Sequence, residues 1–205
     1  MIRRLLVATR NPGKLRELDP LFALAGYGVV DPTSAGIAED AAEDALEAFD
    51  TFEANALAKA RWFSAHAGGL PTVADDSGLE VDALSGRPGV HSKRWAGRTE
   101  LTGQALDDAN NAHLLAALDG MANRGARYVC AAAFVGDGDE LVVRGETRGR
   151  ILDAPRGRAG FGYDPYFFSD DLQCTFGEAA IAEKAAVSHR GRAFGALIAH
   201  LTRRR

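Results

Sequence analysis

Two adjacent carboxylates, Asp75 and Asp76, stand at the end of a predicted short buried strand, residues 71–75, and precede Ser77 and Gly78. Carboxylates in such a place are costly unless a metal ion, a cation or a proton to be moved answers them. We interpret the segment as a strand followed by a turn that brings backbone N–H groups near whatever the carboxylates face. The alternative is a plain Asx-turn that closes a strand.

A second group of polar residues, Thr9, Asn11 and Lys14, lies at the predicted first strand-to-helix turn. Proteins with alternating strands and helices bind anions at such turns, because free backbone N–H groups and the positive end of the helix point outward. The pattern is not a P-loop, since GxxxxGK[ST] is absent. Phosphate binding therefore competes with a simpler interpretation, a capped helix start with a surface lysine.

A third group lies upstream of the acidic pair and consists of Glu47, Asn55 and Lys59. The last two are four residues apart, so they share one face of a predicted helix. Mg²⁺ near a phosphate prefers a few carboxylate oxygens together with phosphate oxygens and water, which makes Glu47 a candidate ligand. The alternative is that Glu47 belongs to a solvated acidic face.

Two further motifs follow in the second half of the chain. Residues 160–166 alternate glycines with aromatic rings, which lets a flat ligand such as a nucleobase approach the backbone while a ring stacks on it; a core aromatic hairpin is the alternative. Later, Ser188 can cap the last helix, which puts Arg190 in its first turns, where a cation needs an anion or acceptor nearby. Lys184 is placed to reach phosphate, and His189 and Arg190 to donate to carbonyl oxygens.

Composition excludes some classes of protein. The chain has 205 residues, 46% of them hydrophobic, with a net charge of −4 and a pI of about 5.7. This acidic balance argues against a nucleic-acid-binding protein. Its two cysteines have no zinc-ligand spacing and fit a reducing cytoplasm. No apolar stretch approaches the length of a membrane span, so we expect a cytoplasmic protein without membrane contacts.

Hydrophobic periodicity predicts an α/β or α+β domain around a central sheet. Residues 32–46 fit either a loop or a helix. The other predicted elements are strand 5–8, a helix from 14 to near 26, strand 27–30, helix 51–67, strands 71–75 and 79–84, loop 86–97, helix 101–118, a hairpin of strands 128–135 and 141–143, an aromatic strand or loop 161–168, and helix 190–202.

Taken in order, the motifs resemble the inosine/xanthosine triphosphate pyrophosphatase family, whose enzymes clear deaminated purine nucleotides. The matching pieces span nearly the whole chain: Thr9-x-Asn11-x-x-Lys14, Thr51-Phe52-Glu53-x-Asn55-Ala56, Ala74-Asp75-Asp76-Ser77-Gly78-Leu79, Pro88-Gly89-Val90-x-Ser92-x-Arg94, Phe161-Gly162-Tyr163-Asp164-Pro165 and Ser188-His189-Arg190-Gly191. Two positions depart from the family pattern: Phe49 replaces a frequent glycine, and Ala185-Ala186 follows Lys184 in place of a polar residue.

The resemblance implies an elongated mixed β-sheet with flanking helices and two lobes around a central cleft, formed by residues 1–205 as a single domain. It also implies a homodimer, Mg²⁺ as cofactor, and hydrolysis of ITP, dITP and XTP to the monophosphate and pyrophosphate, which keeps these nucleotides out of DNA and RNA. By the same resemblance Asp76 activates water and, with Glu47, binds the metal ion. The implied substrate contacts are Thr9, Arg10, Asn11, Pro12, Gly13, Lys14, Lys59 and Lys184 for the triphosphate, Ser77, and Phe161, Gly162, Tyr163, Asp164, His189 and Arg190 for the base.

Donors such as His189 and Arg190 suit the 6-oxo group of hypoxanthine or xanthine, whereas the 6-amino group of adenine would leave them unpaired. A site built on such a hydrogen bond discriminates by roughly 10⁴ or more. Two other functions remain open at this stage. One is a nucleoside triphosphate pyrophosphatase of another base specificity, and the other is a non-catalytic nucleotide sensor.

Overall fold

The computed structural model describes residues 3–203 of the chain. It divides into two compact units. Unit 1 comprises Met1–Asp76, Cys130–Gly145 and Arg190–Arg205, and unit 2 comprises Ser77–Val129 and Glu146–His189. Among the described residues, no helix is long and apolar enough to cross a membrane.

The strands form a six-stranded mixed sheet in the order β2-β1-β3-β4-β5-β6. Strand β1 pairs in parallel with β2 and β3, whereas β5 and β6 are antiparallel. The strands are β1 (Arg3–Val7), β2 (Tyr27–Val30), β3 (Thr72–Val81), β4 (Gly125–Gly136), β5 (Asp139–Ile151) and β6 (Phe167–Ser169). The three long strands β3, β4 and β5 contribute residues to both units.

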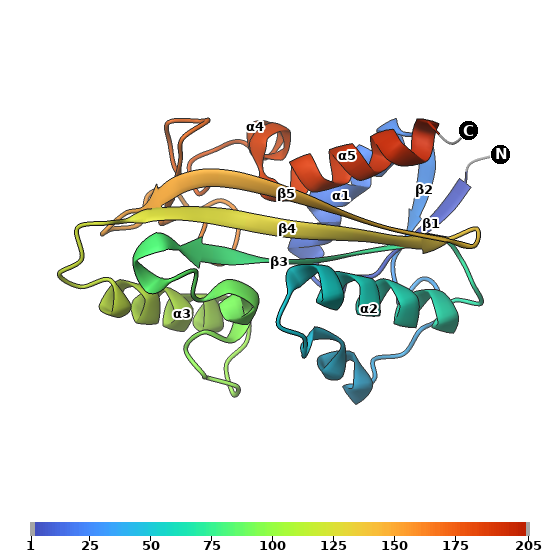
Figure 1. Cartoon of the computed structure of the whole chain (residues 1–205), viewed down its shortest axis with the longest axis horizontal. Coiled ribbons are helices and arrows are strands. Elements are labelled where there is room, and N and C mark those ends of the chain that lie inside the picture. Colours follow the sequence, from blue (N-terminus) through green and yellow to red (C-terminus); the bar gives the residue numbers. More distant parts are fainter. Residues whose placement is uncertain (1–2, 204–205) are drawn as a thin grey trace. The chain divides into compact units, whose positions relative to one another are not determined.

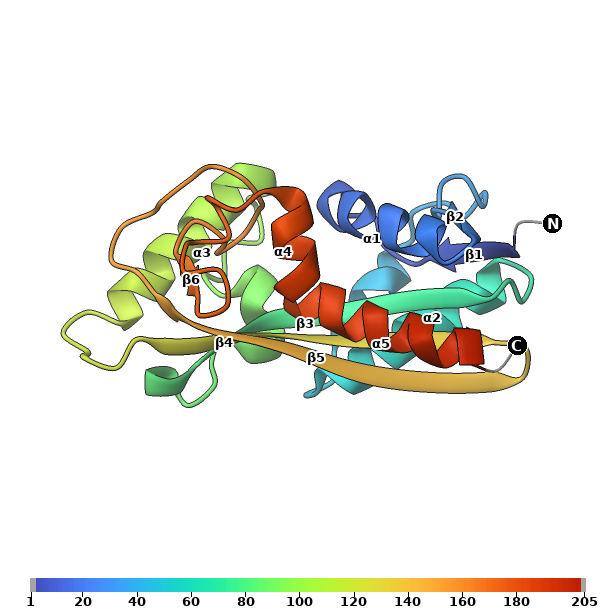
Figure 2. The same cartoon turned by 90° about the horizontal axis from the view of Figure 1, so that it is seen from above.

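In unit 1, helices α1 (Pro12–Leu24) and α5 (His189–Arg203) cover one face of the sheet and α2 (Phe52–His66) covers the other (Figures 1 and 2). The core under α1 and α5 includes Phe22 and Phe194, whose rings meet edge to face at a centroid distance of 5.6 Å. Each fully buried side chain of this size contributes about 1.5–3 kcal/mol of hydrophobic stabilisation.

Two of these helices begin where a side chain caps the backbone. The amide oxygen of Asn11 accepts the N–H groups of Gly13 at 2.7 Å and Lys14 at 3.3 Å, and Pro12 needs no N–H partner in the first turn. The hydroxyl of Thr51 accepts the N–H of Ala54 at 3.2 Å. The predicted starts of these helices are therefore confirmed to within a turn.

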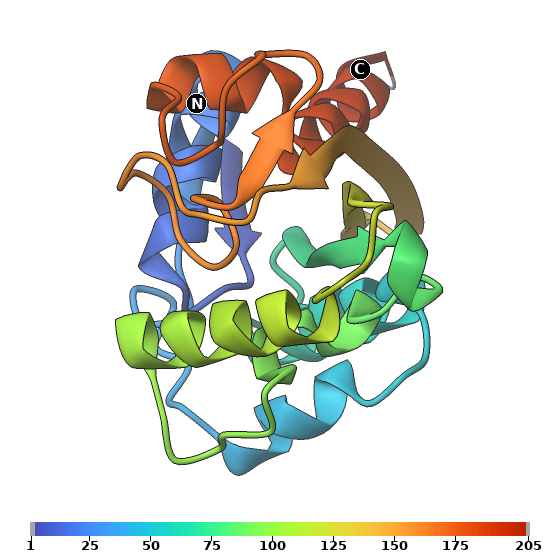
Figure 3. The same ribbon diagram turned by 90° about the vertical axis from the view of Figure 1, so that its left-hand side faces the viewer.

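Unit 2 is built on α3 (Gly103–Ala117), the short helix α4 (Ile181–Val187) and the unit-2 parts of the sheet (Figure 3). Its core is strongly aromatic: the ring of Tyr128 lies 4.6 Å from that of Phe167 and 5.9 Å from that of Phe176. Helix α4 was not predicted from the sequence, because its alanine-rich stretch carries little periodicity. The predicted loop 86–97 contains a 3₁₀ turn, Gly89–Arg94.

The predicted turn after Asp75 is wrong, because Asp75, Asp76, Ser77 and Gly78 all lie inside the continuous strand β3. The charges do not force a turn, since each carboxylate finds partners while the backbone stays extended. The hairpin turn is confirmed: Asp137 and Gly138 have φ angles of 54° and 77°, as the tight turn between β4 and β5 requires. The second strand of the hairpin is far longer than the predicted residues 141–143.

Candidate active site

The two adjacent carboxylates of β3 belong to two different polar networks. Successive side chains of a strand point to opposite faces. Asp75 consequently meets residues of α1 and α5, whereas Asp76 meets α2. Both carboxylates, and the side chains that contact them in the two networks, lie in unit 1.

Asp75 is the centre of the first network and is only 2% exposed. Its Oδ2 lies 3.0 Å from Nζ of Lys14 and 3.3 Å from both Nε and Nη2 of Arg190. The guanidinium of Arg190, itself 3% exposed, also donates from Nη1 to Oε2 of Glu17 at 2.5 Å. The positive end of the dipole of α5 disfavours a cation in the first turn, and the carboxylates of Asp75 and Glu17 offset this effect at Arg190.

These contacts fix the charge states in the first network. Burial alone would raise the pKa of Asp75, but Lys14 and Arg190 lower it well below its usual range. Burial alone would lower the pKa of Arg190, but the carboxylates of Asp75 and Glu17 outweigh this effect and raise the pKa above its usual value. Burial raises the pKa of the Cys130 thiol, with Asp75 adding to it, so Cys130 is an inert neutral thiol.

Asp76 is held by Asn55, whose Nδ2 donates to Oδ2 of Asp76 at 2.8 Å. The same amide accepts the N–H of Phe49 at 2.9 Å and donates to its carbonyl oxygen at 3.2 Å. Burial raises the pKa of Asp76, although Lys59 and Asn55 oppose the shift. The sequence groups Asn55 with Lys59 on one helix face, but Asn55 was not predicted as a substrate contact, a metal ligand or a partner of Asp76.

Lys59 joins the acidic residues of unit 1. Its ammonium forms a short ion pair with Glu47 and donates to the backbone carbonyl of Asp75 at 3.1 Å. Burial would lower the pKa of Lys59, but the carboxylates of Glu47 and Asp75 raise it. The departure at Phe49 leaves this arrangement intact, because Asn55 holds the backbone of Phe49 at both its N–H and its carbonyl.

The donor set for a metal ion is small. The negative charges of Glu47 and Asp76 both raise the pKa of Lys59, and the charge of Glu47 contributes to the raised pKa of Asp76. Among residues 3–203, no cluster of three or more His, Cys, Asp or Glu side chains forms a complete metal cage. Two carboxylates fit Mg²⁺, which commonly takes one or two protein carboxylates and completes its shell with substrate phosphates and water.

The turn before α1 is more engaged than the sequence indicated. Asn11 occupies the N–H groups of Gly13 and Lys14, and the hydroxyl of Thr9 accepts the N–H of Asn11 at 3.2 Å. The guanidinium of Arg10 pairs with Glu43 at 2.6 Å and donates to two backbone carbonyls of residues 37–38. Substrate contacts at this turn remain predictions, and Glu17 and Glu43 are partners that sequence reasoning missed.

In unit 2 the predicted base site is a loop held by its own carboxylate. Oδ2 of Asp164 accepts the N–H of Phe161 at 2.9 Å and pairs with Nζ of Lys184 at 2.7 Å. The ammonium of Lys184 lies 5.1 Å from the centroid of the Phe161 ring, a cation–π distance. Lys184 is thus brought to the predicted base-site residues of its own unit.

Tyr163 and His189 are buried within the same unit. The hydroxyl of Tyr163 donates to the carbonyl oxygen of Ser92 at 2.7 Å, so this ring anchors the loop. The His189 ring stacks on Tyr128 with a centroid distance of 4.6 Å and an interplanar angle of 10°. Ser77 lies half-buried in β3.

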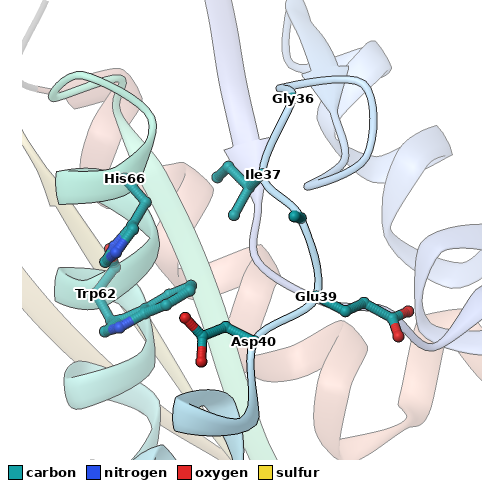
Figure 4. A pocket seen from close by; sticks show the side chains of 7 residues that line it. Gly36, Ile37, Glu39, Asp40, Trp62 and His66 are labelled. Atoms are coloured by element: carbon teal, nitrogen blue, oxygen red, sulfur yellow. The ribbon is translucent and has the colours of Figure 1, made fainter.

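A surface hollow of about 240 Å³ lies elsewhere in unit 1 (Figure 4). It is bounded by Trp62 and His66 of α2 on one side and by residues 36–40 on the other, with the side chain of Glu39 turned away. None of the predicted site residues lines it. Its wall is tied to the site through Arg10, which donates to the carbonyls of Ile37 and Ala38.

Comparison with known proteins decides the family. A model described as the Ham1 family matches residues 5–200. The chain belongs to the Ham1 family. A relative from Frankia alni named dITP/XTP pyrophosphatase is 50% identical, with 93% of each chain covered. The Ham1 protein of Staphylococcus aureus has the same fold, with a TM-score of 0.83 and 33% identity over 99% of this chain and 100% of its own.

Another similar structure, from Mycobacterium abscessus and titled nucleoside-triphosphatase / dITP/XTP pyrophosphatase, is 46% identical over 95% of this chain and 98% of its own, with a TM-score of 0.71. The resemblance drawn from the sequence motifs and the predicted mixed sheet with flanking helices are confirmed. The activity named for these relatives is a nucleotide pyrophosphatase activity, a class that generally depends on a metal ion.

Proposed function

We propose that this Ham1 family protein hydrolyses deaminated purine nucleoside triphosphates, namely dITP, XTP and ITP, to the monophosphate and pyrophosphate. The observation that carries the proposal is Asp76: a buried carboxylate whose Oδ2 accepts a hydrogen bond from Asn55 at 2.8 Å and which lies near the ammonium of Lys59. A carboxylate held in a fixed position is a common general base. The names of the relatives from Frankia alni and Mycobacterium abscessus support the same activity.

In the proposed reaction, Asp76 accepts a proton from a water molecule whose oxygen attacks the α-phosphorus. A new P–O bond forms, the bond from the α-phosphorus to the bridging oxygen breaks, and pyrophosphate leaves with that oxygen. Most of the activation barrier comes from negative charge on the phosphate oxygens, so substrate positioning and nearby cations should contribute most of the rate acceleration. Lys14, Lys59 and Lys184 offset that charge, and residues 9–13 and Ser77 contact the substrate.

We propose Mg²⁺ as the cofactor, held by the carboxylates of Glu47 and Asp76. When bound, the ion would neutralise charge on the phosphate oxygens. Lys59, whose ammonium forms an ion pair with Glu47 and donates to the backbone carbonyl of Asp75, orients the carboxylate of Glu47 for this role. Asn55 does the same for Asp76 by fixing Oδ2.

For the base we propose the loop 161–164 with His189 and Arg190. Phe161 offers a half-buried ring for stacking, and the two basic residues are donors for a 6-oxo group. The bonds from Arg190 to Asp75 and Glu17 support a second role, which is to hold the acidic network in place. Guanine also carries a 6-oxo group, so its rejection depends on the 2-position.

The wider properties remain proposals. We propose that residues 1–205 act as one catalytic domain, that two copies form a homodimer, and that the protein works in the cytoplasm without binding nucleic acid. Gel filtration with light scattering tests the dimer directly.

The decisive experiment measures pyrophosphate release from dITP, XTP, ITP, dATP and dGTP, with Mg²⁺ and with EDTA. We expect metal-dependent turnover of the first three. Equal turnover of dATP and dGTP would support the proposed reaction but contradict the proposed base specificity. Tight nucleotide binding without any pyrophosphate release would identify a sensor and overturn the enzymatic proposal.

A further inference from the structure

Two side chains of helix α3 form hydrogen bonds to the backbone of the base-site loop, residues 161–164. Oδ2 of Asp107 accepts the N–H of Gly162 at 2.8 Å, and Nδ2 of Asn111 donates to the carbonyl oxygen of the same glycine at 3.0 Å. Asp107 and Asn111 are four residues apart and so lie on one face of the helix. All three residues belong to unit 2.

Gly162 is a position where the backbone needs such support. Its φ of +63° is in the left-handed region, which favours glycine. The N–H that Asp107 holds belongs to the peptide that joins Phe161 to Gly162, so this bond fixes the plane next to the Phe161 ring. The N–H of Phe161 is held on the other side by Asp164 at 2.9 Å.

Asp107 and Asn111 are both in unfavourable environments, which a purely structural helix would not require. Burial raises the pKa of Asp107 and the nearby carboxylates of Asp164 and Asp108 add to it, whereas the bond from Gly162 lowers it. Asn111 is buried, and its Oδ1 has no hydrogen-bond partner within residues 3–203. Turning the amide to pair that oxygen would sacrifice the bond to Gly162. The helix therefore keeps a carboxyl of raised pKa and an unpaired amide oxygen while its side chains hold the two peptide groups on either side of Gly162.

We propose that Asp107 and Asn111 are a positioning pair that sets base recognition by locking the peptide groups on both sides of Gly162 and thereby the orientation of the Phe161 ring. This inference rests on the proposed function, because it assigns the loop to the base of the nucleotide. It adds two residues on α3 that do not touch substrate themselves. Their loss should loosen the base site while the acidic network of unit 1 stays intact.

The variant Asp107→Ala tests the pair, with Asp107→Asn as the conservative replacement and Asp108→Ala as the matched control. Asp108 is the adjacent, exposed carboxylate of the same helix. For Asp107→Ala we expect a roughly tenfold higher KM for dITP, about the effect of one well-aligned hydrogen bond, with kcat within about twofold. Asp107→Asn retains an acceptor oxygen and should restore most of the affinity, and Asp108→Ala should behave as wild type.

Hydrogen exchange of the Gly162 amide provides a readout that does not depend on activity. We expect slow exchange in the wild type and in Asp108→Ala, and fast exchange in Asp107→Ala. Fast exchange in the wild type, or an unchanged KM and unchanged discrimination between dITP and dGTP in a folded Asp107→Ala, would overturn the proposal. If Asp107→Ala does not fold, Asn111→Asp replaces it, since it keeps the shape and removes the donor to the Gly162 carbonyl.

The two proposals fail in different ways. A wild type that releases no pyrophosphate from dITP would remove the proposed function, while the exchange rate of Gly162 would still judge whether the pair holds the loop. A wild type that is active, with variants that bind and exchange as it does, would leave the function and remove the positioning pair.

Discussion

The buried carboxylates of the two units are held in contrasting ways. In unit 1, Asp75 is a strand residue, and its partners Lys14 and Arg190 come from two helices far apart in sequence. In unit 2, Asp164 lies in a loop, and it accepts from the backbone of that loop as well as from Lys184. The first network joins rigid elements, whereas the second makes an irregular segment rigid.

This difference suggests a division of labour. Regular elements with paired charges provide a fixed electrostatic environment, which suits a step in which charge develops on phosphate oxygens. A loop held by hydrogen bonds provides shape, which suits recognition of a flat base. Variants of Asp75 and Asp76 in unit 1 should therefore act on global stability or on kcat, and variants of the unit-2 loop on affinity and selectivity.

The largest expected effect belongs to Asp76→Asn. The amide keeps the shape but can neither accept the proton nor offer Mg²⁺ a charged ligand, so we expect kcat for dITP to fall by at least the factor of about 10²–10⁴ that is the usual contribution of general base catalysis. Steady-state pyrophosphate release measures this. The exposed Asp50→Asn is the control, and full turnover by Asp76→Asn would remove the proposed role.

Asp75→Asn should act on stability. Removing one partner of a buried ion pair leaves Arg190 and Lys14 short of an anion, and such losses are about 3–5 kcal/mol. Urea denaturation followed by circular dichroism measures the change. Glu140→Gln, which breaks an exposed pair with Arg61, should show no comparable loss. A loss at Asp75 as small as that of the exposed pair would contradict the contrast between the units.

The pH dependence of stability should change in the same variant. The folded-state pKa of Asp75 is lowered, so its contribution is fully present above the unfolded-state pKa of about 4 and is lost as the pH falls toward the folded-state value. The difference in unfolding free energy between wild type and Asp75→Asn should therefore shrink below about pH 4. A difference that stays constant down to pH 3 would show that Asp75 does not carry this charge effect.

The smallest effect is expected for Tyr163→Phe. It removes the buried hydrogen bond to the carbonyl of Ser92 but keeps the ring, which should cost about 1 kcal/mol. Thermal denaturation measures the loss, and we expect kcat to stay within about twofold. A large loss of kcat with normal stability would place Tyr163 in the chemistry and blur the division between the two units.

Local sequence signals predicted most of the elements of the fold. The caps at Asn11 and Thr51, the hairpin turn at Asp137-Gly138 and the periodicity of α2 all carry their own information. Helix α4 and the full length of β5 could not be predicted from local signals, because both depend on packing partners that are distant in sequence. The turn after Asp75 was mispredicted because adjacent carboxylates and a glycine resemble a turn until their partners on two faces are known.

The residue types of the candidate site could be predicted, but many of their partners could not. The four-residue spacing groups Lys59 with Asn55, but the ion pair between Lys59 and Glu47 was not predicted. Glu17 and Glu43 pair with arginines far along the chain, and no local pattern marks them. Asp107 and Asn111 resemble ordinary helix residues in sequence, and their roles depend on which backbone groups lie opposite them.

The extended path of β3 through Asp75 and Asp76 limits how this stretch of gene can change length. Inserting or deleting one codon between Thr72 and Asp75 would exchange the two faces, so that the carboxylate meant for Arg190 would meet Asn55 instead. Changes of two codons would preserve the faces but displace both networks along the strand. Length variation among homologous genes should therefore be confined to turns such as residues 137–138, where an added residue shifts neither carboxylate.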